Sequence, residues 1–345
     1  MLKFHPLLAE DPAAVLVLRL PIPDVPQQSD FILAAHQAAE ALQLRIEDGD
    51  LAIKPNATAA ERFLMPESGI GTHPGFIWGL VEYLRANGAT DKRVYIVEDP
   101  LNVDYGEVAS WHGTGYLELA AATGAILHSP TLETCVERPV PHPHVVPIRR
   151  VSQYAVDPQI ALINVPKLKT HNLGITTLCL KNLMGLNYGP ERHFCSQAMA
   201  ELPAECVKHD LPRNQWMDQA LHECWQTGLA RRLADLAQVV QPQLSIVEGI
   251  VGRDGTGFQH GRNITLGLIV AGINMVAVDS VTSYLMGFDP AELIYLQVAT
   301  KMGLGSNRLS DLHCYTLKDG ELAPCSSLEP FRADPPFEVN CMIKQ

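Results

Sequence analysis

Short apolar runs alternate with amphipathic segments along most of this chain. Runs rich in Val, Ile and Leu predict buried strands over residues 14–20, 50–55, 93–98, 125–128, 160–165, 244–248 and 265–271. Apolar residues at three- and four-residue spacing predict helices over residues 30–44, 73–87, 115–123, 172–186, 229–240, 274–286 and 290–302. This alternation is typical of an α/β protein with a mostly parallel, doubly wound sheet and helices on both faces.

The segments between these elements predict how the chain is divided. Residues 57–72 are predicted to form a loop, and its length favours a functional role. Residues 129–150 are interpreted as a Pro- and His-rich connector. Beyond residue 303 the pattern weakens. We therefore expect an N-terminal α/β lobe over residues 1–150, a C-terminal α/β lobe over 151–325 and an irregular tail over 326–345, with two domains or one large α/β domain as alternatives.

Composition limits the classes of partner. The 345 residues carry a formal net charge of −12, which argues against nucleic acid and anionic membranes as partners because both require a basic surface. None of the eight cysteines forms a C-x-x-C pair, so reduced thiols are expected. The sequence shows neither a signal peptide nor an apolar run of membrane-spanning length, and a cytoplasmic location is the expectation.

A basic stretch between Ile160 and His193 stands out in this acidic chain. Lys167, Lys169 and His171 follow a predicted strand at alternate positions, so an extended backbone would point all three the same way. They would then lie beyond the carboxyl end of that strand, where open α/β sheets bind ligands. A solvated basic loop is the alternative, and the apolar sequence on both sides favours the ligand site.

The predicted helix over residues 172–186 carries Lys181 and Asn182. Asn172 is a candidate N-cap of this helix. The backbone N–H groups at the amino end of the helix would then point toward the site of Lys167, Lys169 and His171. Lys181 stands among apolar residues, so it either serves a ligand, as an anion contact or an amine base, or pairs with a carboxylate. The candidate carboxylates are those of Asp235, Glu248 and Asp279.

Two other segments have weaker signals. His142 and His144 invite a metal interpretation, but exposed imidazoles of the Pro-rich connector explain them better. The glycine-rich segment over residues 249–263 contains Asp-Gly-Thr-Gly, yet it matches neither a P-loop nor a dinucleotide-binding loop. Its Asp254 and His260 are candidate polar groups that a turn would equally explain.

Five motifs give the chain a family resemblance. They are K-P-N (54–56), T-H-P (72–74), V-P-K-L-K-T-H (165–171), T-x-x-L-K-N-L-M-G (177–185) and D-G-T-G with a later A-V-D (254–279). Together they resemble the domain of unknown function 362 family, which implies no general activity. Many members of that family add a two-cluster ferredoxin module. This chain lacks its cysteines, so no intrinsic iron–sulfur cluster is expected, and electrons would have to come from an external redox partner or a bound cofactor of unknown type.

The resemblance and the basic stretch together define the expected site. Because the carboxyl ends of parallel strands share one edge, the motifs around residues 54 and 167 are expected to meet in one crevice. His171, His73 and Lys181 are the catalytic candidates. The substrate-binding candidates are Lys54, Asn56, Thr72, Lys167, Lys169, Asn182, Arg192 and His193.

These residues favour an enzyme that acts on a small anionic substrate, either a carboxylate or a phosphate. The lysines would bind the anion, a histidine would transfer a proton, and Asn56 or Asn182 would stabilise developing charge. Proton transfer and reduction by an external donor both fit. One alternative is a non-catalytic binding or maturation protein for an anionic cofactor. The other is a metal-dependent enzyme that uses His171, His193, His260, Asp254 and Asp279.

Overall fold

The computed structural model describes residues 1–57, 69–100, 111–202, 219–257 and 260–339. Its main sheet runs in the order β15-β14-β2-β13-β12-β9-β4-β5-β6, and β10 and β11 extend it beside β12. These strands are β2 (Ala14–Arg19), β4 (Asp50–Pro55), β5 (Val94–Val97), β6 (Ile126–His128), β9 (Ile160–Val165), β10 (Lys167–His171), β11 (Ile175–Thr177), β12 (Leu244–Arg253), β13 (Asn263–Gly272), β14 (His313–Lys318) and β15 (Glu321–Pro324).

Parallel pairing dominates the part of the sheet that carries the predicted site. Strand β4 lies between β9 and β5 and is parallel to both, β6 continues this parallel arrangement beyond β5, and β12 is parallel to β9 and to β10. Strand β13 is antiparallel to β12 and to β2. The predicted α/β class with a mostly parallel sheet is confirmed.

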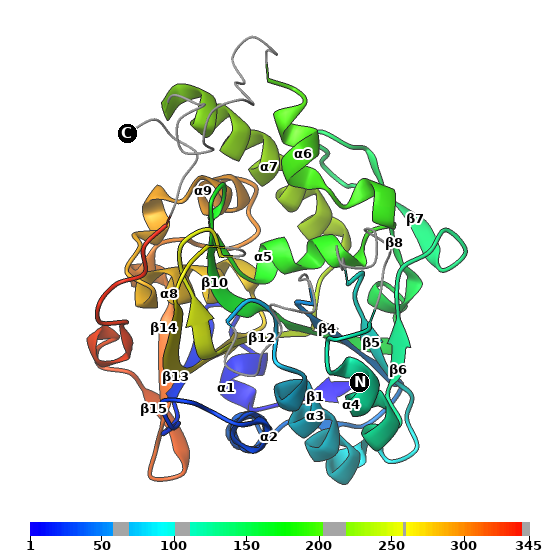
Figure 1. Ribbon diagram of the computed structural model, residues 1–345, viewed down its shortest axis with the longest axis vertical. Helices are drawn as coiled ribbons and strands as arrows, with labels where there is room; N and C mark the ends of the chain where they lie inside the picture. Colours follow the sequence, from blue (N-terminus) through cyan, green and yellow to red (C-terminus); the bar gives the residue numbers. More distant parts are fainter. Residues whose placement is uncertain (58–68, 101–110, 203–218, 258–259, 340–345) are drawn as a thin grey trace.

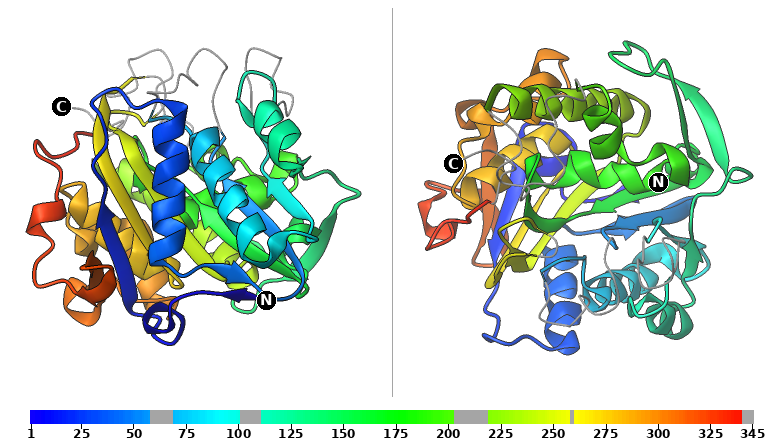
Figure 2. Two further views of the ribbon diagram at one scale, coloured as in Figure 1. Left: turned by 90° about the horizontal axis from the view of Figure 1, so that it is seen from below. Right: turned by 45° about the horizontal axis from the view of Figure 1, so that its top comes forward.

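Helices cover both faces of this sheet (Figures 1 and 2). One face carries α2 (Gln28–Ala41), α3 (Pro74–Leu84) and α4 (Tyr116–Thr123); the other carries α5 (Cys179–Asn182), α6 (Phe194–Met199), α7 (Gln219–Val239), α8 (Met275–Leu285) and α9 (Ile294–Lys301). A further short helix, α1, spans Pro6–Ala9. Among the described helices, none combines the length and the apolar character that crossing a membrane requires.

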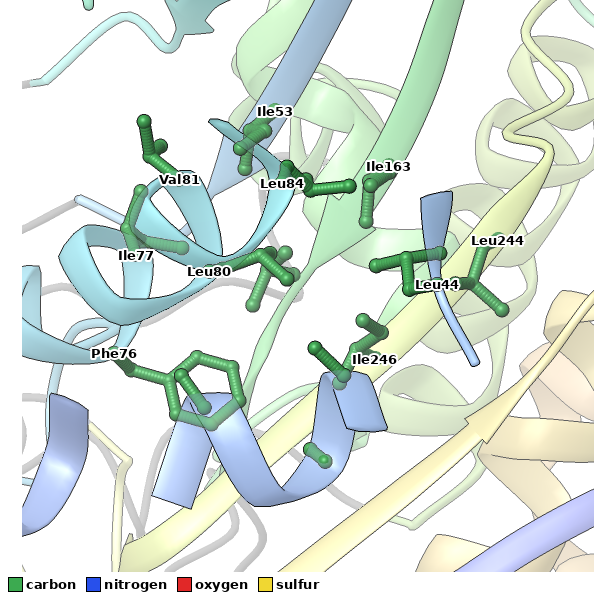
Figure 3. Close-up of a cluster of buried hydrophobic side chains, with 14 of the residues drawn as sticks. Leu44, Ile53, Phe76, Ile77, Leu80, Val81, Leu84, Ile163, Leu244 and Ile246 are labelled. Carbon is green, nitrogen blue, oxygen red and sulfur yellow. The ribbon is translucent and has the colours of Figure 1, made fainter. Parts of the chain in front are cut away.

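Alternation along the strands separates the two cores. In β4, Leu51 and Ile53 pack against α2 and α3, whereas Ala52 between them packs against the opposite helices. Figure 3 shows the first core, in which Leu84 of α3 lies beside Ile53 of β4 and Ile163 of β9. Both faces of the central strands are therefore buried, as their continuous apolar runs predict.

Strands from both predicted lobes belong to the same sheet. Strand β4 of the first lobe pairs with β9 of the second, and β2 lies between β13 and β14. Whether residues 1–150 and 151–325 form independent domains stays a prediction. The pairing of β4 with β9 places the carboxyl ends of strands from both halves at one edge.

The predicted helix over residues 172–186 is wrong in its first half. After a turn, the chain forms β11, which pairs antiparallel with β10, and only Cys179–Asn182 are α-helical before a 3-10 turn over Leu183–Leu186. The β-branched residues Ile175, Thr176 and Thr177 favour the strand. Asn172 therefore does not cap this helix.

The glycine-rich segment is also more regular than predicted. Strand β12 continues to Arg253 and β13 begins at Asn263, so most of the predicted loop is a β-hairpin. The carboxylate of Asp254 accepts hydrogen bonds from the backbone and guanidinium N–H groups of Arg262, so it stabilises the turn of this hairpin. His260 is exposed.

The predicted connector over residues 129–150 contains β7 (Cys135–Pro139), which forms an antiparallel hairpin with β8 (Ile148–Ser152). The buried carboxylate of Asp235 in α7 accepts hydrogen bonds from the backbone N–H groups of His144, Val145 and Val146, and these bonds fasten the hairpin to α7. The pairing of β1 (Leu2–Lys3) with β3 (Arg45–Ile46) and the edge hairpin β14–β15 were not predicted. The predicted helix from residue 290 has a 3-10 turn over Pro290–Glu292, and α9 follows it.

Substituting Gly249→Ala tests why glycine stands within β12. A Cβ atom there would lie 2.8 Å from Leu168 Cδ1 and 2.9 Å from the carbonyl oxygen of Leu268. We expect the substitution to lower the free energy of unfolding by about 1–3 kcal/mol, measured by urea denaturation. Making the same change in a Leu168→Ala background should cost less, because one of the two contacts is removed. An equal cost in both backgrounds would contradict this explanation.

Candidate functional site

A buried ion pair lies where β4 and β5 end. The ammonium group of Lys54, near the end of β4, lies 2.7 Å from Glu98 Oε2, just after β5, and both side chains are buried. The backbone N–H groups of Ala57 and Asp99 also donate hydrogen bonds to the Glu98 carboxylate. Burial lowers the pKa of Lys54 while the charge of Glu98 opposes that change. Lys54 is therefore a cation that already has its counter-ion.

Gly185 allows the chain to pass close to this pair. A Cβ atom at this position would lie 1.7 Å from Glu98 Oε1 and 3.0 Å from Lys54 Cε. No other residue type fits without moving the carboxylate. The glycine of the T-x-x-L-K-N-L-M-G motif therefore has a steric explanation.

A second buried ion pair joins β10 to β12. The sheet register places Lys167 beside Glu248, and Lys167 Nζ lies 2.5 Å from Glu248 Oε2 with both side chains fully buried. The Glu248 carboxylate also accepts hydrogen bonds from the backbone N–H groups of His73 and Ile250. These contacts fasten the start of α3 to the end of the parallel sheet.

His73 is held as the cap of α3. Its Nδ1 accepts a hydrogen bond from the backbone N–H of Gly75 at 3.0 Å, and its ring stacks on Phe31 with 3.7 Å between ring centroids. Burial, together with the nearby charge of Lys167, lowers the pKa of His73 to about 3. The imidazole is neutral and structurally engaged, so its contacts give no support to the predicted proton transfer.

Lys169 is buried, and no carboxylate of the described residues lies within 4.0 Å of its ammonium group. Its Nζ donates hydrogen bonds to Asn56 Oδ1 at 3.0 Å and to the carbonyl oxygen of Ile70 at 2.6 Å. Burial, and then the charges of Lys181 and Lys167, lower its pKa to about 7. Near neutral pH this amine therefore exists in both its charged and neutral forms.

Side-chain amides connect Lys169 to the Lys54 pair. Asn56 Nδ2 lies 3.3 Å from Asn182 Oδ1, and Asn182 Nδ2 donates to Asn164 Oδ1 and to the carbonyl oxygen of Lys54. Thr72 supports Asn56, since its hydroxyl accepts the backbone N–H of Asn56 at 2.9 Å. The network joins β4, β9, β10 and α5, so motifs more than a hundred residues apart in the chain meet here.

Lys181 lines the cavity beside this network and is partly exposed. The three predicted carboxylate partners all bind other groups: Asp235 holds the β7–β8 hairpin, Glu248 pairs with Lys167, and Asp279 accepts backbone N–H groups of α5. The predicted ion pair of Lys181 with one of them is therefore wrong. Within the described ranges, Lys181 has no carboxylate within 4.0 Å.

His171 is a neutral hydrogen-bond donor in this arrangement. Its Nδ1 accepts the backbone N–H groups of Leu173 and Gly174 at 3.0 and 3.1 Å, which assigns the ring hydrogen of the neutral form to Nε2. Burial, followed by the charges of Lys181 and Lys169, holds the pKa of His171 well below its usual value. In β10 it lies on the same side as Lys169, as alternate positions require.

The cavity itself has a volume of about 120 Å³. Arg192, at its wall, pairs closely with Asp99 and donates to the Asp99 carbonyl oxygen at 3.0 Å. Thr177 faces Lys169 across the β10–β11 pair, and His193 lies exposed at the rim. The lining residues are Asn56, Glu98, Asp99, Thr177, Lys181, Asn182, Met184, Gly185, Arg192 and His193.

The described residues do not support the metal site that was considered as an alternative. In residues 1–57, 69–100, 111–202, 219–257 and 260–339, no group of three or more His, Cys, Asp or Glu side chains has metal-binding geometry. Asp279 of α8 is fully buried and accepts the first N–H groups of α5, and Asp254 pairs with Arg262. Neither carboxylate is available in the described arrangement.

Several residues of the site were not among the catalytic or substrate-binding candidates, and Glu248 was predicted only as a candidate partner of Lys181. Glu98, Asp99 and Glu248 supply the counter-ions, and Asn164 supplies an amide acceptor. A signal was present, because each acidic residue stands at or just after the end of an apolar run that predicts a strand. Buried lysines at the same sheet edge need such partners.

Comparisons with known proteins place the chain in context. The family model described as "Domain of unknown function (DUF362)" matches residues 51–284. Over 155 residues the chain is 28% identical to the thylakoid-associated protein sll1697 of Synechocystis sp., a match that covers 45% of this chain and 41% of that protein. A crystal structure of a Thermotoga maritima protein aligns with 85% of this chain and 61% of its own, at 9% identity and a TM-score of 0.39.

Removing one partner of a buried ion pair tests the electrostatics of the site. We expect Glu98→Ala to lower the free energy of unfolding by about 3–5 kcal/mol, because it leaves the buried Lys54 ammonium without a counter-ion. Urea denaturation of the variant and the unaltered chain measures this loss. Adding Lys54→Met should restore part of it.

The pair between Arg93, whose side chain is 68% exposed, and the partly buried Asp50 provides the control. Arg93→Met should cost far less, because solvent screens that interaction. Similar losses for Glu98→Ala and Arg93→Met would contradict the assignment of a buried pair.

Proposed function

This chain belongs to the DUF362 family, whose description specifies no reaction, and from that premise we propose that it is an enzyme for a small anionic substrate. The substrate carries a carboxylate or phosphate group that binds between Lys169 and Lys181. The reaction that the site favours is proton transfer at an atom next to this anionic group. Lys169 takes the proton as a neutral amine, and His171 donates a hydrogen bond through Nε2.

The observation that carries the proposal is a contrast among four lysines. Lys54 and Lys167 each have a carboxylate within 2.7 Å, whereas Lys169 and Lys181 have none within 4.0 Å in the described parts of the chain. Lys169 is nonetheless buried, and the charge of Lys181 acts on it. Two neighbouring cations without a counter-ion in a partly desolvated site favour a bound anion.

Side-chain chemistry favours proton transfer over the other reactions considered. General acid–base catalysis requires a group whose pKa is near the working pH, and the pKa of Lys169 is about 7. The neutral imidazole of His171 supplies a donor for an oxygen that gains charge. Asn182 and Asn56, fixed by the amide network, orient the bound group.

Hydrogen exchange with solvent tests the proposed reaction directly. The chain is incubated in D₂O with a panel of small carboxylates and phosphate esters, and mass spectrometry records deuterium at carbon. We expect exchange into at least one ligand that binds, and none with the Lys169→Met variant. Binding without exchange or any other turnover across the panel would overturn the enzymatic proposal and favour a non-catalytic binding protein.

Removing either unpaired lysine should weaken anion binding. We expect Lys169→Met and Lys181→Met each to reduce the affinity for sulfate about tenfold, since each removes a charged hydrogen-bond donor. Isothermal titration calorimetry measures the dissociation constants. Lys318→Met is the charge-matched control, because Lys318 is exposed on β14, outside the site. Equal affinities for all four proteins would exclude the proposed anion site.

The pH dependence of sulfate affinity should follow Lys169. The affinity should be highest when this amine is protonated and should fall as pH rises through about 7, the pKa of Lys169. Sulfate is the suitable probe because it keeps its charge throughout this range. Calorimetry at several pH values measures the profile, and Lys169→Met should remove the fall. An identical fall in that variant would assign it to another group.

A further inference from the structure

Two residues of the anion site belong to an α-helix of only four residues. Helix α5, Cys179–Asn182, carries Lys181 and Asn182 to the cavity. A helix this short does not form alone, because its few hydrogen bonds do not offset the entropy of ordering the turn. The residue at its N-cap, Leu178, offers no side-chain hydrogen bond. Another part of the chain must hold this turn in place.

That part is the carboxylate of Asp279 in α8. Its Oδ1 accepts the backbone N–H of Cys179 at 2.7 Å, and its Oδ2 accepts the backbone N–H of Leu180 at 3.1 Å. Asp279 is fully buried, and in the described chain no Lys, Arg or His side chain lies within 4.0 Å of its carboxylate. Burial raises the pKa of Asp279 to about 7, and the Cys179 thiol and the two N–H groups at the start of α5 oppose this shift by stabilising the charged form.

Helix α8, which carries Asp279, is capped and largely buried. Asn274 caps its amino end through a hydrogen bond from the backbone N–H of Ala277, and eight of the first nine residues of the helix are buried. Around the carboxylate lie the Cys179 thiol of α5 and the Tyr295 hydroxyl of α9. Asp279 thus joins a rigid helix to the short one that carries the site residues.

We propose that Asp279 is a positioning residue of the anion site: by holding the first two N–H groups of α5, it sets the direction in which Lys181 and Asn182 face the cavity. This inference rests on the proposed function, because it assigns Lys181 to the bound anion. Asp279 does not contact the anion. Its effect on binding passes through Lys181 and its neighbour.

A double-mutant cycle with sulfate as the probe tests this inference. Asp279→Asn retains the shape of the side chain but places an amide N–H against one backbone N–H group. We expect Asp279→Asn to weaken sulfate binding about tenfold, and to have a clearly smaller effect in the Lys181→Met background, where only the contribution through Asn182 remains. A purely structural role would instead weaken binding equally in both backgrounds. Calorimetry measures all four dissociation constants.

Ser280→Ala is the matched control. Ser280 is the next residue of α8, is equally buried, and donates its main hydrogen bond to the Val276 carbonyl oxygen of its own helix. We expect unchanged sulfate affinity for this variant. Hydrogen exchange followed by mass spectrometry adds a direct readout, since the amides of α5 should exchange faster in Asp279→Asn than in Ser280→Ala.

The outcomes separate the two proposals. Sulfate binding that survives Asp279→Asn unchanged, or losses that add fully with Lys181→Met, would overturn the positioning role alone. Equal exchange of the α5 amides in both variants would do the same. Failure of the unaltered chain to bind sulfate, phosphate or small carboxylates would overturn the anion site and the positioning role together.

Discussion

The burial of lysine side chains at the carboxyl edge of the sheet is the constraint on which this structure depends. A buried ammonium group without a counter-ion is costly, so each of Lys54 and Lys167 requires a carboxylate at hydrogen-bond distance. Glu98, just after β5, and Glu248, within β12, provide these carboxylates. The two pairs fix the relative positions of four strands and leave little freedom for the residues between them.

Lys169 is a buried lysine of the same edge that satisfies this constraint differently. It lies on the same side of β10 as Lys167, yet amide and carbonyl oxygens replace the carboxylate. Its charge, with that of Lys181, forms a local excess of positive charge in a chain whose net charge is −12. The acidic exterior disfavours polyanions, whereas a cavity of about 120 Å³ admits a small anionic group. If an anion binds here as proposed, the same arrangement selects both its sign and its size.

Local patterns in the sequence predicted the mostly parallel sheet, most helices of both faces and the edge at which the K-P-N and V-P-K-L-K-T-H motifs meet through Asn56 and Lys169, because these follow from periodicity and from the direction of parallel strands. They did not predict the strand before Lys181. Local spacing favours a helix there, but pairing with β10 and the carboxylate of Asp279, a hundred residues away, determine the structure. The hairpin held by Asp235 depends on a similarly distant carboxylate. Contacts of this kind leave no periodic signal.

Anion binding and proton transfer are physically linked in such a site. The pKa of Lys169 and that of His171 are lowered by burial and by neighbouring cations, so a bound anion must raise both. By reciprocity, protonation of Lys169 strengthens binding of the anion. A substrate that brings a carboxylate next to Lys169 therefore makes the neutral amine a stronger base and at the same time lowers the fraction of Lys169 that is neutral. The paired lysines could not respond in this way, since their carboxylates already stabilise the charged form.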